Sequence, residues 1–115
     1  MSAALPRDLP TAPTEPHWRV LHVSGQLNAH EAPQLRQQFL DALAEGSTHL
    51  ILDMSSVEFI DSTGLGVLVA GLKRARSVGG ELRLGAPSRT VVKVLRITGL
   101  STIFEIVEQP GASAA

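Results

Sequence analysis

Two neighbouring hydroxyl groups follow an acidic residue in the segment F-I-D-S-T-G-L-G, residues 59–66. Asp61, Ser62 and Thr63 stand between an apolar run and a segment with a glycine at every second position. A carboxylate here suits a helix N-cap, because it accepts a backbone N–H and interacts favourably with the positive end of the helix dipole. One capping residue is enough, so three polar side chains in series indicate a further role.

Three kinds of chemistry could use these hydroxyls. A serine nucleophile needs a histidine base, but the four histidines are scattered and the segment does not fit G-x-S-x-G. A phosphate-binding loop would need G-x-x-x-x-G-K-[ST], which the segment also lacks. The third chemistry makes a hydroxyl the substrate of a protein kinase. A phosphate on Ser62 would add about -1.5 to -2 charges at a helix N-terminus, where the dipole tolerates them.

The glycines in the following helix require a separate explanation. Gly64, Gly66 and Gly71 each cost roughly 0.5–1 kcal/mol relative to alanine in a helix interior. Such a cost is understandable where the helix lies close to a sheet or leaves a flat surface for another protein. We interpret Gly64 and Gly66 as positions that keep the bulk of the helix surface small where a partner approaches.

The elements that must position these residues follow from a periodicity that changes repeatedly between about 2 and 3.6. Strands are predicted at 18–24, 49–54, 81–86 and 103–107, with a loop at 57–59. Helices are predicted from Pro33 to Gly46, from the D-S-T segment to Gly79-Gly80, and from Pro87-Ser88 to Gly99. This alternation predicts an α/β fold with substantial parallel pairing and crossover helices. Ser62 then lies in a loop at the carboxyl edge of the sheet, where ligands and partners usually meet such a domain.

Length and composition limit the classes of function. A chain of 115 residues fits one domain, which we expect at 17–108 between a Pro-rich flexible tail at 1–16 and a flexible C-terminal tail at 109–115. Net charge is -1, which argues against nucleic acid as a partner. There is no cysteine, no histidine pair with ligand spacing in one element, no secretory signal and no membrane-spanning run. We therefore expect a cytoplasmic protein without a metal site or membrane partner.

Three segments together resemble the STAS-domain family of anti-sigma factor antagonists: residues 57–68 with D-S-T-G-L-G, residues 79–84, and residues 98–104. The resemblance implies a single α/β domain with a mixed, mostly parallel sheet of four to five strands. It also implies that the unphosphorylated protein binds an anti-sigma factor that is a serine/threonine kinase, which frees a sigma factor. Phosphorylation of the serine after the aspartate, Ser62 here, would abolish this binding, and a metal-dependent serine phosphatase would reverse it.

The same resemblance implies a protein without catalytic residues or a cofactor of its own, and a transient partner suits a monomer. Many members have G-[ED]-L-D where this chain has G-Q-L-N, so Asn28 keeps a capping oxygen but lacks the charge of the family's aspartate. Lys73, Arg74 and Arg76 are interpreted as a solvated helix face. The predicted partner-binding residues are Asn28, Asp61, Ser62, Thr63, Gly64, Leu65 and Gly66, with Ser62 as phosphate acceptor in preference to Thr63.

Two other functions remain open from the sequence. The chain could be a constitutive STAS-domain subunit of a larger signalling or lipid-transport assembly, in which case a negative charge at Ser62 would not change the association. It could also be a small serine hydrolase, in which case Ser62 would react with a fluorophosphonate probe.

Overall fold

Four strands form a single sheet in the computed structural model, which describes residues 17–108. The elements are β1 (Trp18–Leu27), α1 (Ala32–Ala44), β2 (His49–Ile60), α2 (Ser62–Ser77), β3 (Glu81–Gly85), α3 (Arg89–Ile97), the short 3-10 helix η2 (Leu100–Thr102) and β4 (Glu105–Val107). The α/β class and the crossover helices are as predicted. Every pairing among residues 17–108 is parallel, more uniformly than the mixed sheet that we expected. The predicted tails, 1–16 and 109–115, lie outside the described residues.

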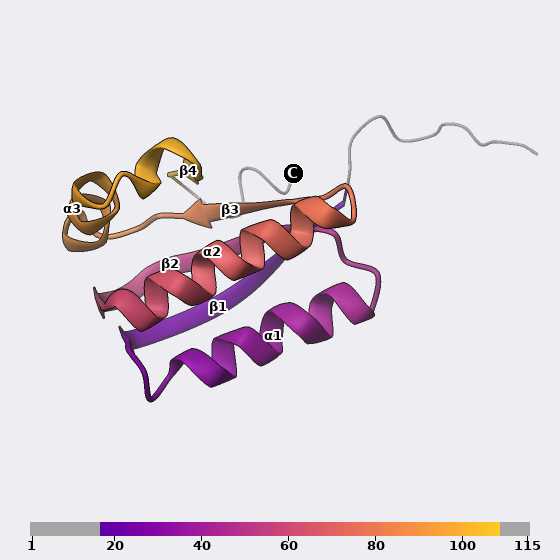
Figure 1. Ribbon diagram of the computed structural model, residues 1–115, viewed down its shortest axis with the longest axis horizontal. Helices are drawn as coiled ribbons and strands as arrows, with labels where there is room; N and C mark the ends of the chain where they lie inside the picture. The colour runs from indigo at the N-terminus through magenta and orange to yellow at the C-terminus, as the bar shows by residue number, and fades with distance from the viewer. Residues whose placement is uncertain (1–16, 109–115) are drawn as a thin grey trace, which may run out of the picture.

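The helices cover the sheet because consecutive strands are neighbours that run in the same direction, in the order β1-β2-β3-β4. Figure 1 shows α1 and α2 lying across one face of the sheet, with α3 beyond the end of β3, at the end of the molecule where β2 finishes. The core under these helices is apolar and includes Leu35, Phe39, Leu50, Leu52, Met54, Leu68, Leu72, Leu82, Leu84 and Leu95. None of the helices within residues 17–108 is both long enough and apolar enough to cross a membrane.

The ends of α1 and α3 lie where the sequence signals place them. Pro33 lies in the first turn of α1, and Gly46, just after this helix, has a φ of 91° that favours glycine. The side chain of Ser88 caps α3 by accepting a hydrogen bond of 3.2 Å from the N–H of Val91. Gly99, with a φ of 78°, follows the end of α3.

The first two strands are longer than predicted. The alternation in β1 stops at Gly25, near two shifts in the register with β2, between His22 and Ser24 and between Gly25 and Gln26. At each shift β2 contributes one extra residue. Gly25 has a φ of 76°, and the strand then continues to Leu27, which pairs with Ile60. The predicted loop at 57–59 is therefore wrong, since β2 runs through it to Ile60.

The last strand is shorter than predicted. Residues 103–107 alternate in sequence, but the strand begins only at Glu105. Ile103 belongs to the preceding turn, because its N–H donates to the carbonyl oxygen of Leu100 at 3.1 Å. Phe104 is buried in the core at this point, so packing of its ring fixes where the turn ends.

Candidate functional site

The candidate site lies at the edge of the sheet where β1 and β2 end. Leu27 and Ile60 are paired in the parallel register, and the N–H of Asp61 donates to the carbonyl oxygen of Leu27 at 3.2 Å. The chain leaves the sheet immediately after these residues, at Asn28 on one strand and at Asp61 on the other. The structure therefore brings Asn28 to the same edge as the D-S-T segment, although the two are more than thirty positions apart in the sequence.

Asp61 is the N-cap of α2, as predicted. Its backbone is extended, with φ -108° and ψ -175°, and its side chain accepts a hydrogen bond of 2.9 Å from the N–H of Gly64. Its carbonyl oxygen accepts a further bond of 2.9 Å from the N–H of Leu65. The carboxylate thus satisfies one of the N–H groups that every helix leaves without a partner at its start.

Asn28 organises the turn that leads into α1. Its side-chain Oδ1 accepts hydrogen bonds from the N–H groups of His30 at 3.0 Å and Glu31 at 3.1 Å. Its carbonyl oxygen also accepts from the N–H of Ala32 at 2.8 Å. The backbone role of this position is therefore fulfilled by a neutral side chain, so the missing charge of the family's aspartate affects the surface and not the turn.

Ser62 and Thr63 are the first two residues of α2, and both are exposed. Within residues 17–108 neither hydroxyl group takes part in a hydrogen bond. The Ser62 hydroxyl is therefore accessible to an enzyme at the end of a helix whose dipole favours added negative charge.

The glycines after the hydroxyls have different surroundings. Gly64 is buried, and a Cβ atom there would lie 2.3 Å from the carbonyl oxygen of Leu27 and 2.9 Å from its Cγ. Leu65 is also buried, at 8% exposure, in the core cluster. Gly66 is exposed, and a Cβ atom there would meet nothing within 4 Å. Gly64 thus lets α2 approach β1 closely, and of these three residues only Gly66 is available for contact with a partner.

The basic residues of α2 are all exposed, but they differ in their contacts. Lys73 and Arg74 are exposed, as predicted. The guanidinium of Arg76, however, lies 2.9 Å from the carboxylate of Glu81 and donates at 3.2 Å to the carbonyl oxygen of Ile103. Arg76 is exposed as predicted, and it also links α2 to β3 and to the turn before β4.

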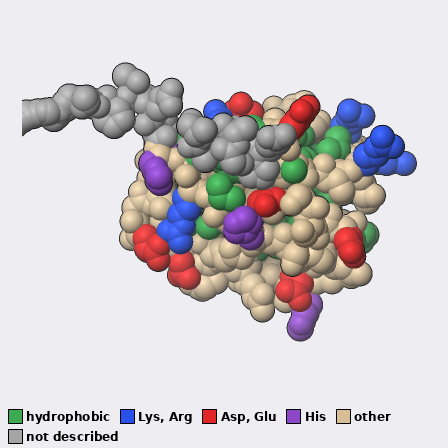
Figure 2. All heavy atoms as spheres, turned by 180° about the vertical axis from the view of Figure 1, so that it is seen from behind, with side chains coloured by type: hydrophobic (Ala, Val, Ile, Leu, Met, Phe, Trp, Pro, Cys, Tyr) green, Lys and Arg blue, Asp and Glu red, His purple; other side chains and the backbone are tan. Residues whose placement is uncertain are grey.

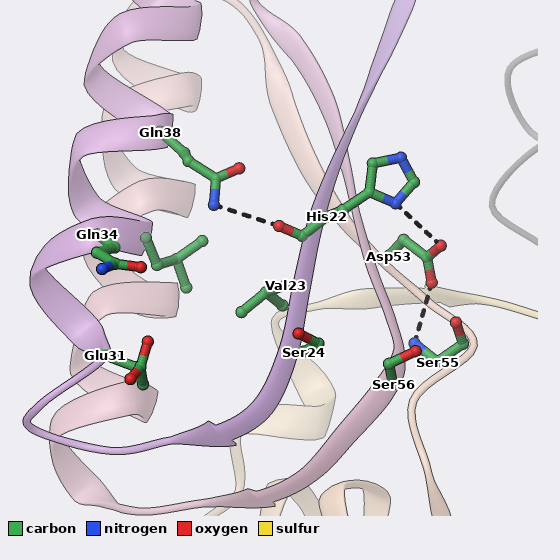
Figure 3. A pocket seen from close by; sticks show the side chains of 10 residues that line it. His22, Val23, Ser24, Glu31, Gln34, Gln38, Asp53, Ser55 and Ser56 are labelled. Carbon is green, nitrogen blue, oxygen red and sulfur yellow. Dashed lines mark hydrogen bonds and ion pairs between the residues drawn. The ribbon is translucent and has the colours of Figure 1, made fainter.

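A hollow of about 260 Å³ lies between α1 and β1, and no predicted site residue lines it. Figure 3 shows the pair at its rim, where Nδ1 of His22 lies 3.3 Å from Oδ2 of Asp53. The N–H of Ser55 holds the pKa of Asp53 below its ordinary value; partial burial opposes this effect, and His22 adds to it. This pair could not be predicted from the sequence, because the two residues meet only through the β1–β2 register. Within residues 17–108, no cluster of three or more potential metal ligands occurs.

The cap provides a first prediction, for the variant Asp61→Ala. Loss of the accepting oxygen is expected to lower the free energy of unfolding by about 1 kcal/mol, measured by chemical denaturation. Asp61→Asn is the matched control, because it keeps the oxygen that accepts from Gly64, and it should stay near wild type. Equal losses in both variants would show that the cap does not depend on that oxygen.

The sequence model of the STAS domain family matches residues 10–111. The chain is 35% identical to the anti-sigma-B factor antagonist of Bacillus subtilis over 86 aligned residues. The alignment covers 75% of this chain and 78% of that protein. A crystal structure of a putative anti-sigma factor antagonist from Thermotoga maritima superposes with a TM-score of 0.77 at 33% identity, covering 84% of this chain and 83% of that one. The Bacillus cell fate determinant SpoIIAA, solved in its phosphorylated form, superposes with a TM-score of 0.65 at 26% identity. The superposition covers 86% of this chain and 90% of that one.

A parallel sheet with this helix arrangement and a capped D-S-T-G-L-G segment at its edge defines a STAS domain, and the chain belongs to the STAS domain family. Within that family, relatives at 33–35% identity are named as anti-sigma factor antagonists, which confirms the resemblance seen in the sequence.

Proposed function

We propose that this protein is an anti-sigma factor antagonist and that phosphorylation of Ser62 switches its affinity for its partner. The observation on which this rests is the exposed hydroxyl of Ser62 in the first turn of α2, directly after the capping residue Asp61. The unphosphorylated protein binds an anti-sigma factor that is a serine/threonine kinase, and the sigma factor is released. Relatives named as anti-sigma factor antagonists support this function, and the phosphorylated form of one relative supports the modification.

The position of Ser62 makes a surface switch physically reasonable. The hydroxyl projects from an exposed position and makes no hydrogen bond within the described residues, so a phosphate can be added without opening the fold. At a helix N-terminus the added charge of about -1.5 to -2 interacts favourably with the dipole. The domain therefore stays folded while the surface that faces the partner becomes strongly anionic beside Asp61.

In this function the protein supplies a binding surface and an acceptor, and the partner supplies the catalysis. The γ-phosphoryl group of ATP is transferred to Oγ of Ser62, with release of ADP and the hydroxyl proton. A metal-dependent serine phosphatase later hydrolyses the phosphate ester. Asn28, Asp61, Ser62, Thr63 and Gly66 face the partner in the cytoplasm, and the free protein is a monomer.

Intact-mass measurement tests the acceptor directly. After incubation with Mg²⁺, ATP and the anti-sigma factor kinase of the same organism, wild type and Thr63→Ala should each gain the mass of one phosphoryl group. Ser62→Ala should gain none. Phosphate on the Ser62→Ala variant, or none on wild type, would contradict the proposal. Thr63→Ala is a matched control because it removes the neighbouring exposed hydroxyl in the same helix turn.

A further inference from the structure

One side of α3 is a stripe of cations. Val91 and Leu95 of this helix are buried, whereas Arg89, Lys93 and Arg96 are exposed. Their spacing of four and then three residues places them on one face of the helix. We name these three residues the α3 basic stripe. Among residues 17–108 none of the three has a carboxylate partner, although Arg19, Arg76 and Arg83 each form an ion pair.

Helix stability does not explain the stripe. A cation is favourable in the last turn of a helix, which accounts for Arg96, but unfavourable near the start. Arg89 is the first residue of α3, and the first turn contains no acidic residue to offset it. The charge at this end of the helix therefore opposes the dipole, as expected for a residue that serves an interaction outside the helix.

An exposed apolar side chain adjoins the stripe. Ile97 is 73% exposed, more than any other large hydrophobic residue that the structure describes, and it lies one helix turn after Lys93. Arginine beside an exposed apolar residue is typical of a protein–protein contact, in which the apolar group is buried and the charges surround it.

The stripe begins at the same end of the molecule as Ser62. Strands β2 and β3 are parallel neighbours, α2 starts after the end of β2, and α3 starts shortly after the end of β3. Figure 1 shows the start of α2 and the whole of α3 at this end of the sheet. Seen from behind, lysine and arginine side chains project from the surface where α3 lies (Figure 2). One partner protein of ordinary size could cover both Ser62 and the α3 basic stripe.

We propose that the α3 basic stripe, with Ile97, is a second docking surface for the anti-sigma factor kinase, which meets it with an acidic surface. This inference rests on the proposed function. The whole molecule has a net charge of -1 and does not attract an acidic partner, so the attraction must be local to the stripe. An acidic partner is also the kind that a phosphate on Ser62 repels most strongly, which agrees with the sign of the switch.

Other anionic partners fit the surface less well. Three cations neutralise few phosphates, and affinity for nucleic acid depends on the number of phosphates neutralised. A single exposed isoleucine offers little apolar area for insertion into a lipid surface. The combination of a short basic stripe and one apolar side chain favours a protein.

Charge reversal tests the stripe against a matched control. The stripe variant is Arg89→Glu with Lys93→Glu and Arg96→Glu. The control variant is Arg36→Glu with Lys73→Glu and Arg74→Glu, which changes the net charge equally at exposed positions of α1 and α2. Binding of the purified anti-sigma factor kinase is measured by surface plasmon resonance at low and high salt.

The association rate of the stripe variant should fall by about tenfold or more near 0.1 M salt, and the difference should shrink as salt rises. The control should associate within about threefold of wild type, since its charges lie outside the contact. Ile97→Ser should mainly raise the dissociation rate. Circular dichroism should show all variants folded, because every replaced side chain is exposed. The single change Lys93→Glu provides the same test with a smaller perturbation.

Three other outcomes of this binding experiment would overturn the inference. Equal association of the stripe variant and the control would overturn this inference and leave the proposed function intact. Failure of wild type to bind the kinase would overturn both. Binding of wild type, but not of the stripe variant, to anionic phospholipid vesicles or duplex DNA, with unchanged kinase binding, would assign the stripe to another class of partner and overturn the inference.

Discussion

Gly64→Ala is expected to lower the free energy of unfolding by about 2–3 kcal/mol, even though alanine is the better helix former. The new Cβ atom would lie 2.3 Å from the carbonyl oxygen of Leu27 and 3.0 Å from Cγ1 of Ile60. A backbone oxygen held in the β1–β2 ladder cannot turn aside as the end of a flexible side chain can. The helix must therefore move away from the sheet, which also displaces the first turn that presents Ser62. Chemical denaturation measures the loss.

Gly66→Ala is the matched control in the same helix. A Cβ atom at this exposed position meets nothing within 4 Å, so alanine should raise the free energy of unfolding by about 0.5–1 kcal/mol. If the flat surface at Gly66 is needed by the partner, this more stable variant should bind the anti-sigma factor kinase more weakly. Destabilisation of both variants to the same extent would contradict the packing role of Gly64.

The predictable part of the site is the part determined by local hydrogen bonds. Asp61 could be identified as an N-cap, and Pro87-Ser88 as the start of α3, because a capping side chain bonds to a backbone group three residues ahead. Gly46 and Gly99 could be identified as helix ends because a left-handed residue is needed there whatever surrounds it. Signals of this kind lie within one short segment of sequence, so no knowledge of the tertiary structure is required.

The roles of Gly64 and Leu65 could not be predicted, because they depend on contacts far away in the sequence. Gly64 is small because Leu27 lies against it, and nothing in the D-S-T-G-L-G segment identifies Leu27 as its neighbour. The sequence therefore suggested a partner-facing pair of glycines, whereas the structure buries one of them. Arg76 is a similar case, since Glu81 and Ile103 approach it only in the folded chain.

The extension of β2 was missed for a related reason. At each of the two register shifts β2 contributes one extra residue, which interrupts the alternation that identifies a strand, so residues 57–59 resembled a loop. The added length matters for the site, because it carries the start of α2 to the edge of the sheet beside Asn28. From local sequence patterns alone, the turn at Asn28 and the start of α2 would not be predicted to lie at the same edge.

Phosphorylation of Ser62 is expected to weaken binding of the anti-sigma factor kinase by about a hundredfold, which corresponds to roughly 2.8 kcal/mol. Ser62→Ala should bind like wild type, and Ser62→Glu should lose part of the affinity because it adds one charge in place of nearly two. Isothermal titration calorimetry with the purified kinase measures the dissociation constants. Ser77→Glu is the matched control, since it adds the same charge at an exposed serine at the opposite end of α2.

The thermal stability of the phosphorylated protein separates a switch at the surface from a change of fold. A phosphate at the start of α2 interacts favourably with the helix dipole, so the melting temperature should stay the same or rise while the affinity falls. A phosphorylated protein that binds weakly because it has unfolded would contradict the surface mechanism. A stable complex with subunits that are not kinases, unaffected by Ser62→Glu, would instead identify a constitutive subunit of a larger assembly. The affinity and the stability must therefore change independently if Ser62 acts through the charge that it presents to the partner.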